Sequence, residues 1–274
     1  MSRQEIYNVS EELEGVRLDK ALVEVLPGSG LRLRRRLCDE GKVLINGKVR
    51  KPGYKVRTGQ ELIIRSGVVT MTHEELGLKI IHRNDQFAAV YKPGAVHSAR
   101  IEGKGSANVE DVLPSLFPDS APVLLNRLDY LTSGILLVAL NSDGVNKYRE
   151  LEDAGDIKKF YKARVKGRFD GFVSVQSKLD CDDRKTTKVL EESDVDTRRW
   201  TEVEAIAHDR DLDTTDVRCL IVKGARHQIR AHLASIGHPI VGDPMYGDAA
   251  GDLLHLHHQR IEFPGFEAEQ DGPF

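Results

Sequence analysis

A cluster of polar residues between two apolar runs has the composition of a catalytic loop. Within residues 121–140, Asn126, Arg127, Asp129 and Thr132 stand between these runs. An ionised aspartate can attack an electrophilic carbon or remove a proton, and an arginine beside it can hold a phosphate or the carboxylate itself. Considered alone, however, an Asp in a loop more often caps a turn and pairs with a neighbouring arginine.

The apolar runs on either side predict two buried strands that hold this loop. Residues 123–125 and 135–140 are short and rich in branched side chains, and Thr-Ser-Gly at 132–134 supplies turn residues between them. If the first strand continues to Asp129, its two-residue period places Arg127 and Asp129 on one face. The sequence therefore predicts a carboxylate and a guanidinium at the mouth of a buried sheet.

Four ordered blocks of the chain resemble the RluA-type pseudouridine synthases. Arg-Leu-Asp at 127–129 with Thr-Ser-Gly at 132–134 resembles the family signature, in which the aspartate is the catalytic carboxylate. Residues 85–97, which contain Lys-Pro-Gly, resemble the segment before the signature. Residues 159–163 resemble the strand with the active-site tyrosine, and 224–247 resemble the block with the active-site arginine. Four ordered blocks are far more specific than one short motif.

The resemblance assigns roles to individual residues. It implies that the catalytic residues are Asp129, Tyr161 and Arg230. It implies that the substrate is also held by Arg127, Thr132 and Arg226. Tyr161 would stack on the uracil, and Arg230 would favour the ionised form of Asp129. Arg127 would take the space, or hold the phosphate, that a flipped nucleotide leaves behind.

The chemistry that the resemblance implies is an isomerisation. The N1–C1′ bond of a uridine breaks, the retained uracil rotates, and the link is rebuilt through C5. The carboxylate either attacks the sugar or removes a C2′ proton, and the sequence leaves both routes open. Because the implied reaction is an isomerisation, no redox cofactor, nucleotide or metal is expected, and the sequence agrees in having no P-loop, dinucleotide fingerprint or Cys/His ligand spacing.

The proposed arginine lies in a segment with helical spacing. Residues 226–236 have apolar positions four apart, which predicts a helix. Arg226 and Arg230 are then on one face, from which one guanidinium can meet the catalytic carboxylate. Two departures from the family pattern lie near the site. Lys-Gly-Ala-Arg stands at 223–226 where Thr-Gly-Arg-Thr is more usual, and Asn126 stands where His is usual.

Basic residues are concentrated in one small module near the N-terminus. The net charge is −3, yet residues 32–57 hold ten Lys or Arg against two acids, so this segment carries +8 and the rest of the chain −11. Helical spacing at 17–26, a helix over 31–40 capped by Ser29, and a hairpin at Asn46-Gly47 form a compact unit. The order resembles the small alpha-L, or S4-like, RNA-binding domain.

This second resemblance implies phosphate contacts along the basic segment. The residues expected to bind RNA are Arg32, Arg34, Arg35, Arg36, Lys42, Lys48 and Arg50. The helix pattern places Arg32, Arg35 and Arg36 on its solvated face. A generic Arg run is more often only a solvated surface, but a local excess of positive charge inside an acidic chain favours RNA binding.

The whole chain is predicted to be an α+β protein with a long mixed, mostly antiparallel sheet. Residues 1–65 would form the S4-like domain, 66–77 a linker and 78–274 the catalytic domain. Residues 100–120, rich in Gly, Ser, Asp and Pro, are expected to form a surface excursion. No stretch approaches the ~20 apolar residues of a membrane span. We therefore expect a cytoplasmic, monomeric enzyme with RNA as its partner and no membrane association.

Two groups of potential metal ligands have simpler explanations. The acidic residues at 180–183 lack the glycine spacing of a calcium loop, which favours a solvated turn. The three histidines at 255, 257 and 258 lie in an alternating run typical of a structural strand. Neither group is expected to bind a metal.

Other functions remain to be weighed against a synthase of large-subunit ribosomal RNA, which family analogy favours. A synthase directed to transfer RNA would share the same residues. A non-catalytic RNA-binding assembly protein would have lost Asp129, Tyr161 or Arg230, and all three are present. A carboxylate-nucleophile hydrolase would require an acidic metal site near Asp129, and the sequence supplies none.

Overall fold

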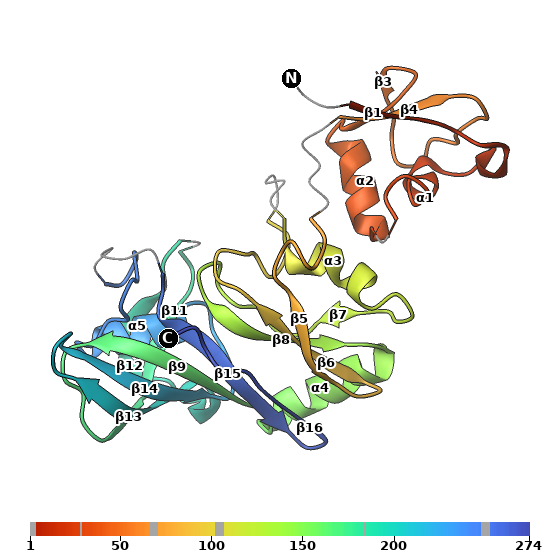
Figure 1. Cartoon of the computed structure of the whole chain (residues 1–274). Coiled ribbons are helices and arrows are strands. Elements are labelled where there is room, and N and C mark those ends of the chain that lie inside the picture. The colour runs from red at the N-terminus through yellow and green to blue at the C-terminus, as the bar shows by residue number, and fades with distance from the viewer. Residues whose placement is uncertain (1–3, 28, 66–70, 102–106, 184, 248–252) are drawn as a thin grey trace. The chain divides into compact units, whose positions relative to one another are not determined.

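The computed structural model describes residues 4–27, 29–65, 71–101, 107–183, 185–247 and 253–274 (Figure 1). The chain forms two compact units. The smaller comprises Met1–Leu76 and Ala99–Pro122, and the larger comprises Gly77–Ser98 and Val123–Phe274. The linker predicted at 66–77 lies in part, at 66–70, outside the described residues. Among the helices of the described segments, none combines the length and apolar character that crossing a membrane requires.

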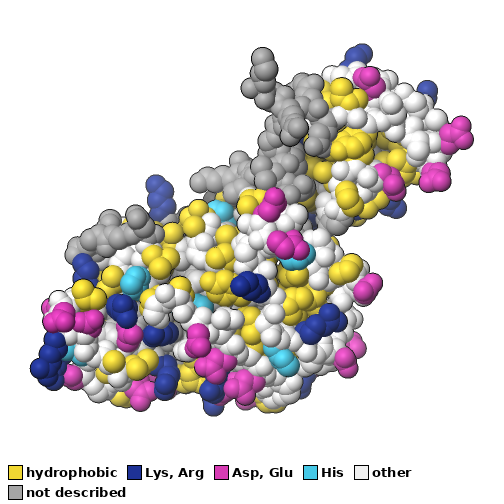
Figure 2. Space-filling view, in the orientation of Figure 1, with side chains coloured by type: hydrophobic (Ala, Val, Ile, Leu, Met, Phe, Trp, Pro, Cys, Tyr) yellow, Lys and Arg dark blue, Asp and Glu magenta, His cyan; other side chains and the backbone are white. Residues whose placement is uncertain are grey.

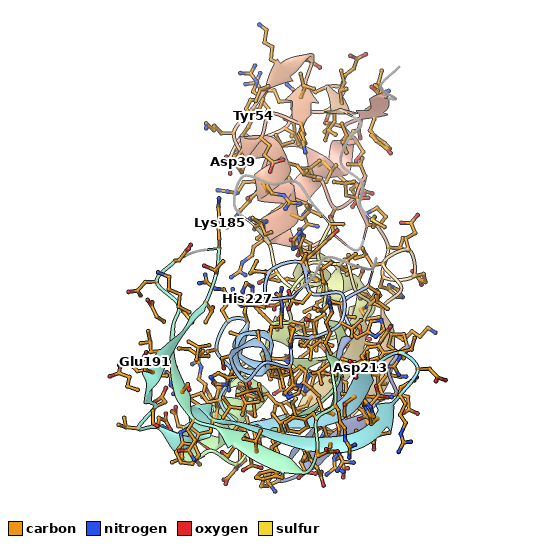
Figure 3. All side chains as sticks on the ribbon, turned by 90° about the vertical axis from the view of Figure 1, so that its left-hand side faces the viewer. Asp39, Tyr54, Lys185, Glu191, Asp213 and His227 are labelled. Carbon is orange, nitrogen blue, oxygen red and sulfur yellow. The ribbon has the colours of Figure 1, made fainter. Side chains whose placement is uncertain are left out.

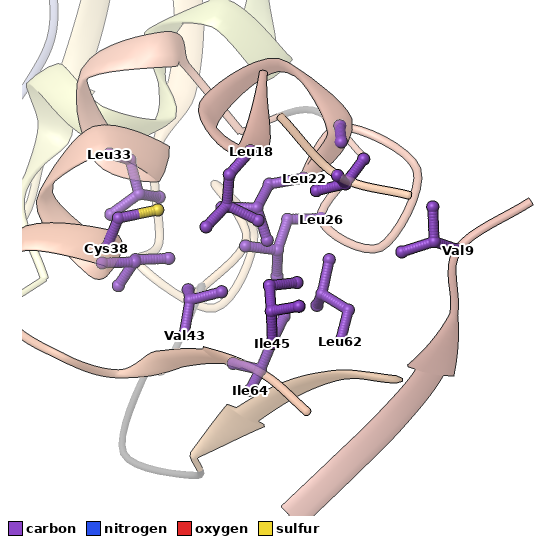
Figure 4. Close-up of a cluster of buried hydrophobic side chains, with 13 residues drawn as sticks. Val9, Leu18, Leu22, Leu26, Leu33, Cys38, Val43, Ile45, Leu62 and Ile64 are labelled. Carbon is purple, nitrogen blue, oxygen red and sulfur yellow. The ribbon is translucent and has the colours of Figure 1, made fainter. Parts of the chain in front are cut away.

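The smaller unit contains a four-stranded sheet and short helices, and the first two α-helices share an apolar core with the sheet. The sheet has the order β1-β4-β2-β3. Its strands are β1 (Gln4–Asn8), β2 (Val43–Ile45), β3 (Lys48–Val49) and β4 (Glu61–Arg65). The helical elements are η1 (Glu11–Leu13), α1 (Leu18–Ala21), α2 (Leu31–Asp39) and α3 (Val109–Leu116). Side chains from α1, α2, β2 and β4 form one apolar core, which includes Leu18, Leu33, Val43 and Leu62 (Figure 4).

Local sequence signals account for most of this unit. Asn46 and Gly47 both have positive φ, 49° and 73°, as the predicted hairpin requires. The cap of α2 was wrongly predicted: Gly30 is the N-cap, and the Ser29 hydroxyl instead donates to the Leu26 carbonyl, at 2.6 Å. The expected surface excursion also contains a helix, α3, which begins after Asn108, whose side chain caps it.

The larger unit is built on a ten-stranded sheet. Eight strands follow the order β10-β13-β14-β9-β15-β8-β6-β5, while β16 pairs with β15 and β7 with β8. The strands before the first long helix are β5 (Lys79–Arg83), β6 (Phe87–Lys92), β7 (Val123–Leu124) and β8 (Ser133–Ala139). Those after it are β9 (Lys158–Lys166), β10 (Phe172–Val175), β13 (Thr201–Asp209), β14 (Thr214–Ile221), β15 (Leu256–Phe263) and β16 (Phe266–Glu269). Only β8 and β15 pair in parallel among the described strands, so the predicted mixed, mostly antiparallel α+β fold is confirmed.

Helices and a hairpin complete this unit. The remaining elements are α4 (Ser142–Ala154), β11 (Ser177–Asp180), β12 (Lys188–Ser193), η2 (Thr197–Arg199) and α5 (Gln228–Ser235). Tyr148 and Leu151 of α4 join Phe87, Ile135 and Phe263 of the sheet in an apolar cluster. Every residue of β8 is buried, as its continuous apolar run predicts. On the face seen in Figure 2, basic and acidic side chains of the larger unit are interspersed.

The parallel pair β8 and β15 explains the glycine and histidines of two sequence blocks. Gly134 has a φ of 121°, and a Cβ there would lie 2.4 Å from the backbone oxygen of His258. His257 Nδ1 bonds Ser133 Oγ at 2.8 Å, and His258 Nδ1 donates to the Ile135 carbonyl at 2.6 Å. The run at 255–258 therefore leads into a structural strand, as predicted.

Candidate active site

The loop that bears Asp129 is held by side chains rather than by strand pairing. Strand β7 ends at Leu124 and does not continue to Asp129, so Arg127 and Asp129 lie in irregular backbone and the two-residue period of a strand does not apply to them. The Asn126 side-chain oxygen accepts from the Leu137 N–H at 2.7 Å. This amide oxygen satisfies a backbone donor of β8 at the point where the chain leaves regular pairing.

Ser98 and Lys92, which precede the signature in the sequence, also hold this loop. The Ser98 hydroxyl accepts from the Leu128 N–H at 2.9 Å and donates to the Leu128 carbonyl at 2.8 Å. The fully buried Lys92 ammonium donates to the carbonyls of Pro93 and Val96, both at 2.9 Å, and to that of Tyr130 at 3.4 Å. Burial lowers the pKa of Lys92 to about 7, although the nearby Asp129 acts in the opposite direction.

Arg230 connects Asp129 to a second, buried carboxylate. Its Nη1 donates to Asp129 Oδ2 at 3.0 Å. Its Nε and Nη2 donate to the two oxygens of Asp243, each at 2.8 Å. Arg230 is 4% exposed and Asp243 is fully buried. The bidentate pair fixes the guanidinium plane, which in turn positions the Asp129 carboxylate.

Asp243 remains ionised because several donors converge on it. Burial alone would raise its pKa, but Arg230 and the backbone N–H groups of Met245 and Tyr246 outweigh this and lower it. Both N–H groups donate to Oδ1, at 2.9 and 3.1 Å. The Tyr246 ring also lies 5.2 Å from the guanidinium carbon of Arg230. Arg230 therefore has partners on both its edge and its face.

Tyr161 points into the same site from β9. Side-chain burial alternates along this strand, and Tyr161 is on the buried face, as predicted. Its ring stacks on His258, with centroids 4.5 Å apart and planes at 18°. Burial lowers the pKa of His258 to about 3 and raises that of Tyr161, on which Asp129 has a smaller effect in the same direction. Both rings are thus neutral at physiological pH.

His227 also reaches the site, and sequence analysis missed it. It precedes α5 in the left-handed conformation, with φ of 55°, and is labelled in Figure 3 beside that helix. Its Nδ1 lies 3.0 Å from the Tyr246 hydroxyl, and its Nε2 lies 3.8 Å from Asp129 Oδ2. The only available signal was its place in the His-Gln-Ile-Arg block, which does not indicate which way the ring points.

Arg226 was wrongly predicted to share a helix face with Arg230. Helix α5 begins at Gln228, because the left-handed His227 interrupts the backbone before it. The Arg226 guanidinium donates to the carbonyls of Cys181 and Thr186, at 2.9 and 3.0 Å, and also to that of Asp183. It therefore holds the turn between β11 and β12.

A small cavity brings the remaining predicted residues together. Among its lining residues are Arg127, Asp129, Thr132, Tyr161, His227 and Arg230. Five of the six predicted catalytic and substrate-binding residues therefore share one cavity, and Arg226 is not among its lining residues. Thr132 is 2% exposed, and its hydroxyl has no hydrogen-bond partner among the described residues. A hydroxyl in this state is available to a bound ligand.

In the smaller unit, several arginines of the predicted RNA-binding set have structural partners. Asp19 is fully buried and accepts from Arg17 and from Arg35, whose Nε is 2.8 Å away. Hydrogen bonds from Arg17 lower the Asp19 pKa to about 2, against the effect of burial. Arg34 donates to the Asp19 carbonyl at 2.9 Å. Arg36 is only 13% exposed and pairs with acids, so its predicted place on a solvated face was wrong.

Other members of the set have more solvent contact. The Arg32 side chain is 84% exposed, and Lys48 is exposed in the hairpin. Lys42 pairs with Glu40 at 3.1 Å, and Arg50 lies over the Tyr54 ring at 5.0 Å. Arg32 and Lys48 are therefore the most accessible cations of the set.

Comparisons with known proteins identify the family of the chain. The family described as RNA pseudouridylate synthase matches residues 86–235, and the S4 domain matches residues 16–62. The chain is 32% identical over 267 residues to ribosomal large subunit pseudouridine synthase C of Escherichia coli strain K12, covering 90% of this chain and 81% of that protein. It is 30% identical over 262 residues to an uncharacterized RNA pseudouridine synthase of Aquifex aeolicus, covering 90% and 82%.

A solved structure shares the fold. The human RNA pseudouridylate synthase domain containing 1 matches with a TM-score of 0.60 at 24% identity, over 72% of this chain and 84% of that one. The fold and the matched sequence together define an RNA-modifying isomerase. The chain belongs to the RNA pseudouridylate synthase family, with an S4 domain towards its N-terminus.

Proposed function

We propose that this enzyme converts uridine to pseudouridine in large-subunit ribosomal RNA, with Asp129 as its catalytic carboxylate and without a cofactor. The observation that carries the assignment is that Asp129 and Arg230 line the same cavity as Tyr161, with Arg230 held from behind by the buried Asp243. An isomerisation involves no net oxidation or reduction, and a positioned carboxylate supplies the nucleophile or base that it needs.

The neighbours of Asp129 have separate tasks in this proposal. Arg230 holds the carboxylate in one orientation through its contact at 3.0 Å. Tyr161, backed by His258, offers a neutral aromatic face on which the uracil stacks. Thr132 offers a buried hydroxyl to the substrate. Arg127, which is exposed at the mouth of the cavity, contacts the phosphate beside the flipped nucleotide.

The reaction begins with loss of the glycosidic bond. Either an Asp129 oxygen attacks C1′, or Asp129 removes the C2′ proton and a glycal forms. In both cases the electron pair of the C1′–N1 bond remains on the uracil. After rotation, C5 bonds to C1′ while the Asp129–C1′ bond breaks, or while the proton that Asp129 removed returns to C2′ of the glycal. C5 then loses its proton and N1 gains one, so the product is an isomer of the substrate. Arg226 contributes through the β11–β12 turn that it holds, at the edge of the site.

The choice of RNA is supported by the relatives. The Escherichia coli strain K12 relatives are named ribosomal large subunit pseudouridine synthases C and D. In this proposal the enzyme acts on that RNA in the cytoplasm, as a monomer. A transfer RNA substrate is the competing assignment, and it differs in the molecule modified rather than in the chemistry.

Mapping pseudouridines in total RNA tests the proposal. Cells that lack the protein should lose pseudouridine at defined positions of large-subunit ribosomal RNA and regain it when the gene is restored. Loss confined to transfer RNA would overturn the substrate assignment. An unchanged map of both RNA classes would contradict the proposed function as a whole.

We also propose that residues 1–65 act as a separate RNA-anchoring domain, joined by 66–77 to the catalytic domain at 78–274. The accessible cations Arg32 and Lys48 are the first candidates for phosphate contacts. Arg32 forms an ion pair with Glu110 at 3.3 Å but is 84% exposed, whereas Lys42 and Arg50 are secondary because both are less exposed and have partners. The remaining three, Arg34, Arg35 and Arg36, contact Asp19 or Glu40 within residues 1–65 and support the shape of this domain.

The Arg32→Ala and Lys48→Ala variants should each bind long RNA less tightly. RNA binding releases fewer counterions for each phosphate contact that is lost. The slope of log K against log salt should therefore become shallower by about 0.7–0.9 per contact. Arg168→Ala is a matched control, since Arg168 is a 65% exposed arginine on the other unit that pairs with Asp170. Slopes equal to that of the control would assign these cations to a solvated surface.

A further inference from the structure

Among the described residues, the imidazole of His227 has a hydrogen-bond partner on one of its two nitrogens. Nδ1 is 3.0 Å from the Tyr246 hydroxyl. Nε2 faces the carboxylate of Asp129, but at 3.8 Å it is beyond hydrogen-bond distance. His227 also lines the cavity that contains Tyr161 and Arg230. The proposed reaction has so far given this ring no task.

Its neighbours fix which nitrogen carries the proton. The Thr187 N–H donates to the Tyr246 hydroxyl oxygen at 2.7 Å, and a backbone N–H cannot accept in return. Within the described chain, His227 Nδ1 is then the acceptor within reach of the phenol hydrogen. A neutral ring that accepts at Nδ1 carries its proton on Nε2. The chain from Thr187 through Tyr246 therefore places an N–H donor in the cavity.

The ring is neutral for physical reasons. Burial is the largest effect and lowers the pKa of His227, and the guanidiniums of Arg230 and Arg226 lower it further. Asp129 acts in the opposite direction but does not compensate. Neutrality matters because a protonated ring would compete with Arg230 for the carboxylate of Asp129. The Nε2–H thus remains a donor that Asp129 does not occupy.

A donor at this position would stabilise the charge that develops when the glycosidic bond breaks. The uracil leaves with the bonding electron pair, and its negative charge spreads from N1 to the adjacent carbonyl oxygen O2. This is true whether Asp129 attacks C1′ or removes the C2′ proton. O2 lies next to the sugar carbon at which Asp129 acts, and therefore next to the space that His227 Nε2 faces at 3.8 Å from Asp129 Oδ2.

We propose that His227 is a further catalytic residue, whose Nε2–H donates a hydrogen bond to a carbonyl oxygen of the departing uracil and stabilises its negative charge. No proton is transferred in this step. The inference rests on the proposed function, because it requires a uracil stacked on Tyr161 and activated by Asp129. Preorganised donors of this kind act where charge develops, and removing one costs about 10²–10³ in kcat.

A matched pair of substitutions tests the donor. His227→Gln keeps an N–H donor near the Nε2 position, whereas His227→Met has similar length and no donor. Both side chains are unbranched at Cβ, so the left-handed backbone should affect them alike. With saturating unmodified large-subunit ribosomal RNA transcript, the Met variant should lose about 10²–10³ in single-turnover rate, with unchanged RNA binding, and the Gln variant should recover part of that loss.

The leaving group provides a second readout that a purely structural role would not change. Fluorine at C5 stabilises the uracil anion, so a transcript made with 5-fluorouridine needs the donor less. The rate at which N1-linked 5-fluorouridine disappears should therefore be reduced less by His227→Met than the rate for uridine is. Tyr246→Phe keeps the ring over Arg230 but frees the tautomer of His227, so its loss should be smaller than that of the Met variant.

Each outcome discriminates between the assignments. Equal defects for the Gln and Met variants, unchanged by fluorine, would overturn the donor role. A wild-type rate for the Met variant would also overturn it, while an inactive Asp129→Asn variant in the same assay would leave the proposed function standing. Turnover by Asp129→Asn would instead contradict the proposed function itself.

Discussion

The Asp129→Asn variant should be folded, should bind RNA, and should form essentially no pseudouridine. We expect a loss of about 10⁴–10⁶ in rate, the range seen when a catalytic carboxylate or nucleophile is replaced. An amide has the same shape, but it neither attacks C1′ nor removes a C2′ proton. Its oxygen can still accept from Arg230 Nη1, now 3.0 Å from the carboxylate. Single-turnover assays on an unmodified large-subunit ribosomal RNA transcript would measure the loss.

Binding and stability measurements separate this effect from misfolding. The Asp129 side chain is 25% exposed, and Arg230 keeps its ion pair with Asp243. Replacing Asp129 by Asn therefore leaves no buried charge without a partner. Asp170→Asn serves as a control, because Asp170 is 68% exposed and pairs only with Arg168 among the described residues. The control should retain wild-type turnover. Substantial turnover by the Asp129 variant would remove the carboxylate from the mechanism.

Some of this site could be predicted from sequence because local patterns determine it. Alternating burial along β9 places Tyr161 inward, and the glycine of Thr-Ser-Gly is required where β8 meets β15. The two departures from the family pattern can also be interpreted. Asn126 bonds the backbone of β8, and Arg226 holds the turn before β12. Both contacts are structural, so neither departure changes a residue to which we assign a catalytic role.

Other features could not be predicted because they depend on contacts that no local pattern encodes. Asp243 lies 13 residues after Arg230 and meets it only because the chain turns back after α5. His227 lies in an apparently helical run, yet its left-handed backbone turns the ring towards Asp129. In the smaller unit, the helical spacing predicts that Arg35 faces solvent, but Arg35 instead forms an ion pair with the buried Asp19.

Removing Arg230 should have the second large effect, on stability as well as on activity. The Arg230→Met variant leaves Asp243 fully buried without its bidentate partner. Breaking a buried pair in this way costs about 3–5 kcal/mol, because the remaining charge is no longer compensated. Asp129 also loses the contact that orients it. Urea unfolding at pH 7 would measure the first loss, and single-turnover assays the second.

A double variant separates the two effects. In Arg230→Met with Asp243→Asn, the buried charge is gone, and the amide can still accept from the backbone of Met245 and Tyr246. Much of the stability should return, whereas turnover should remain low because Asp129 still lacks its partner. Additive stability losses in the double variant would mean that Arg230 and Asp243 are not energetically coupled.

The pH dependence of the Arg230→Met defect provides the sharpest test of the buried pair. In the wild type the folded pKa of Asp243 is lowered, so its stabilisation is present above the ordinary aspartate value of about 3.9 and is lost only as the pH falls through the lowered pKa. Without Arg230, burial dominates and should raise that pKa, so the variant takes up a proton as the pH falls. Its deficit in unfolding free energy should then shrink by up to about 1.4 kcal/mol per pH unit between pH 8 and 5. A deficit that stays constant over this range would show that an ionised Asp243 is not what destabilises the variant.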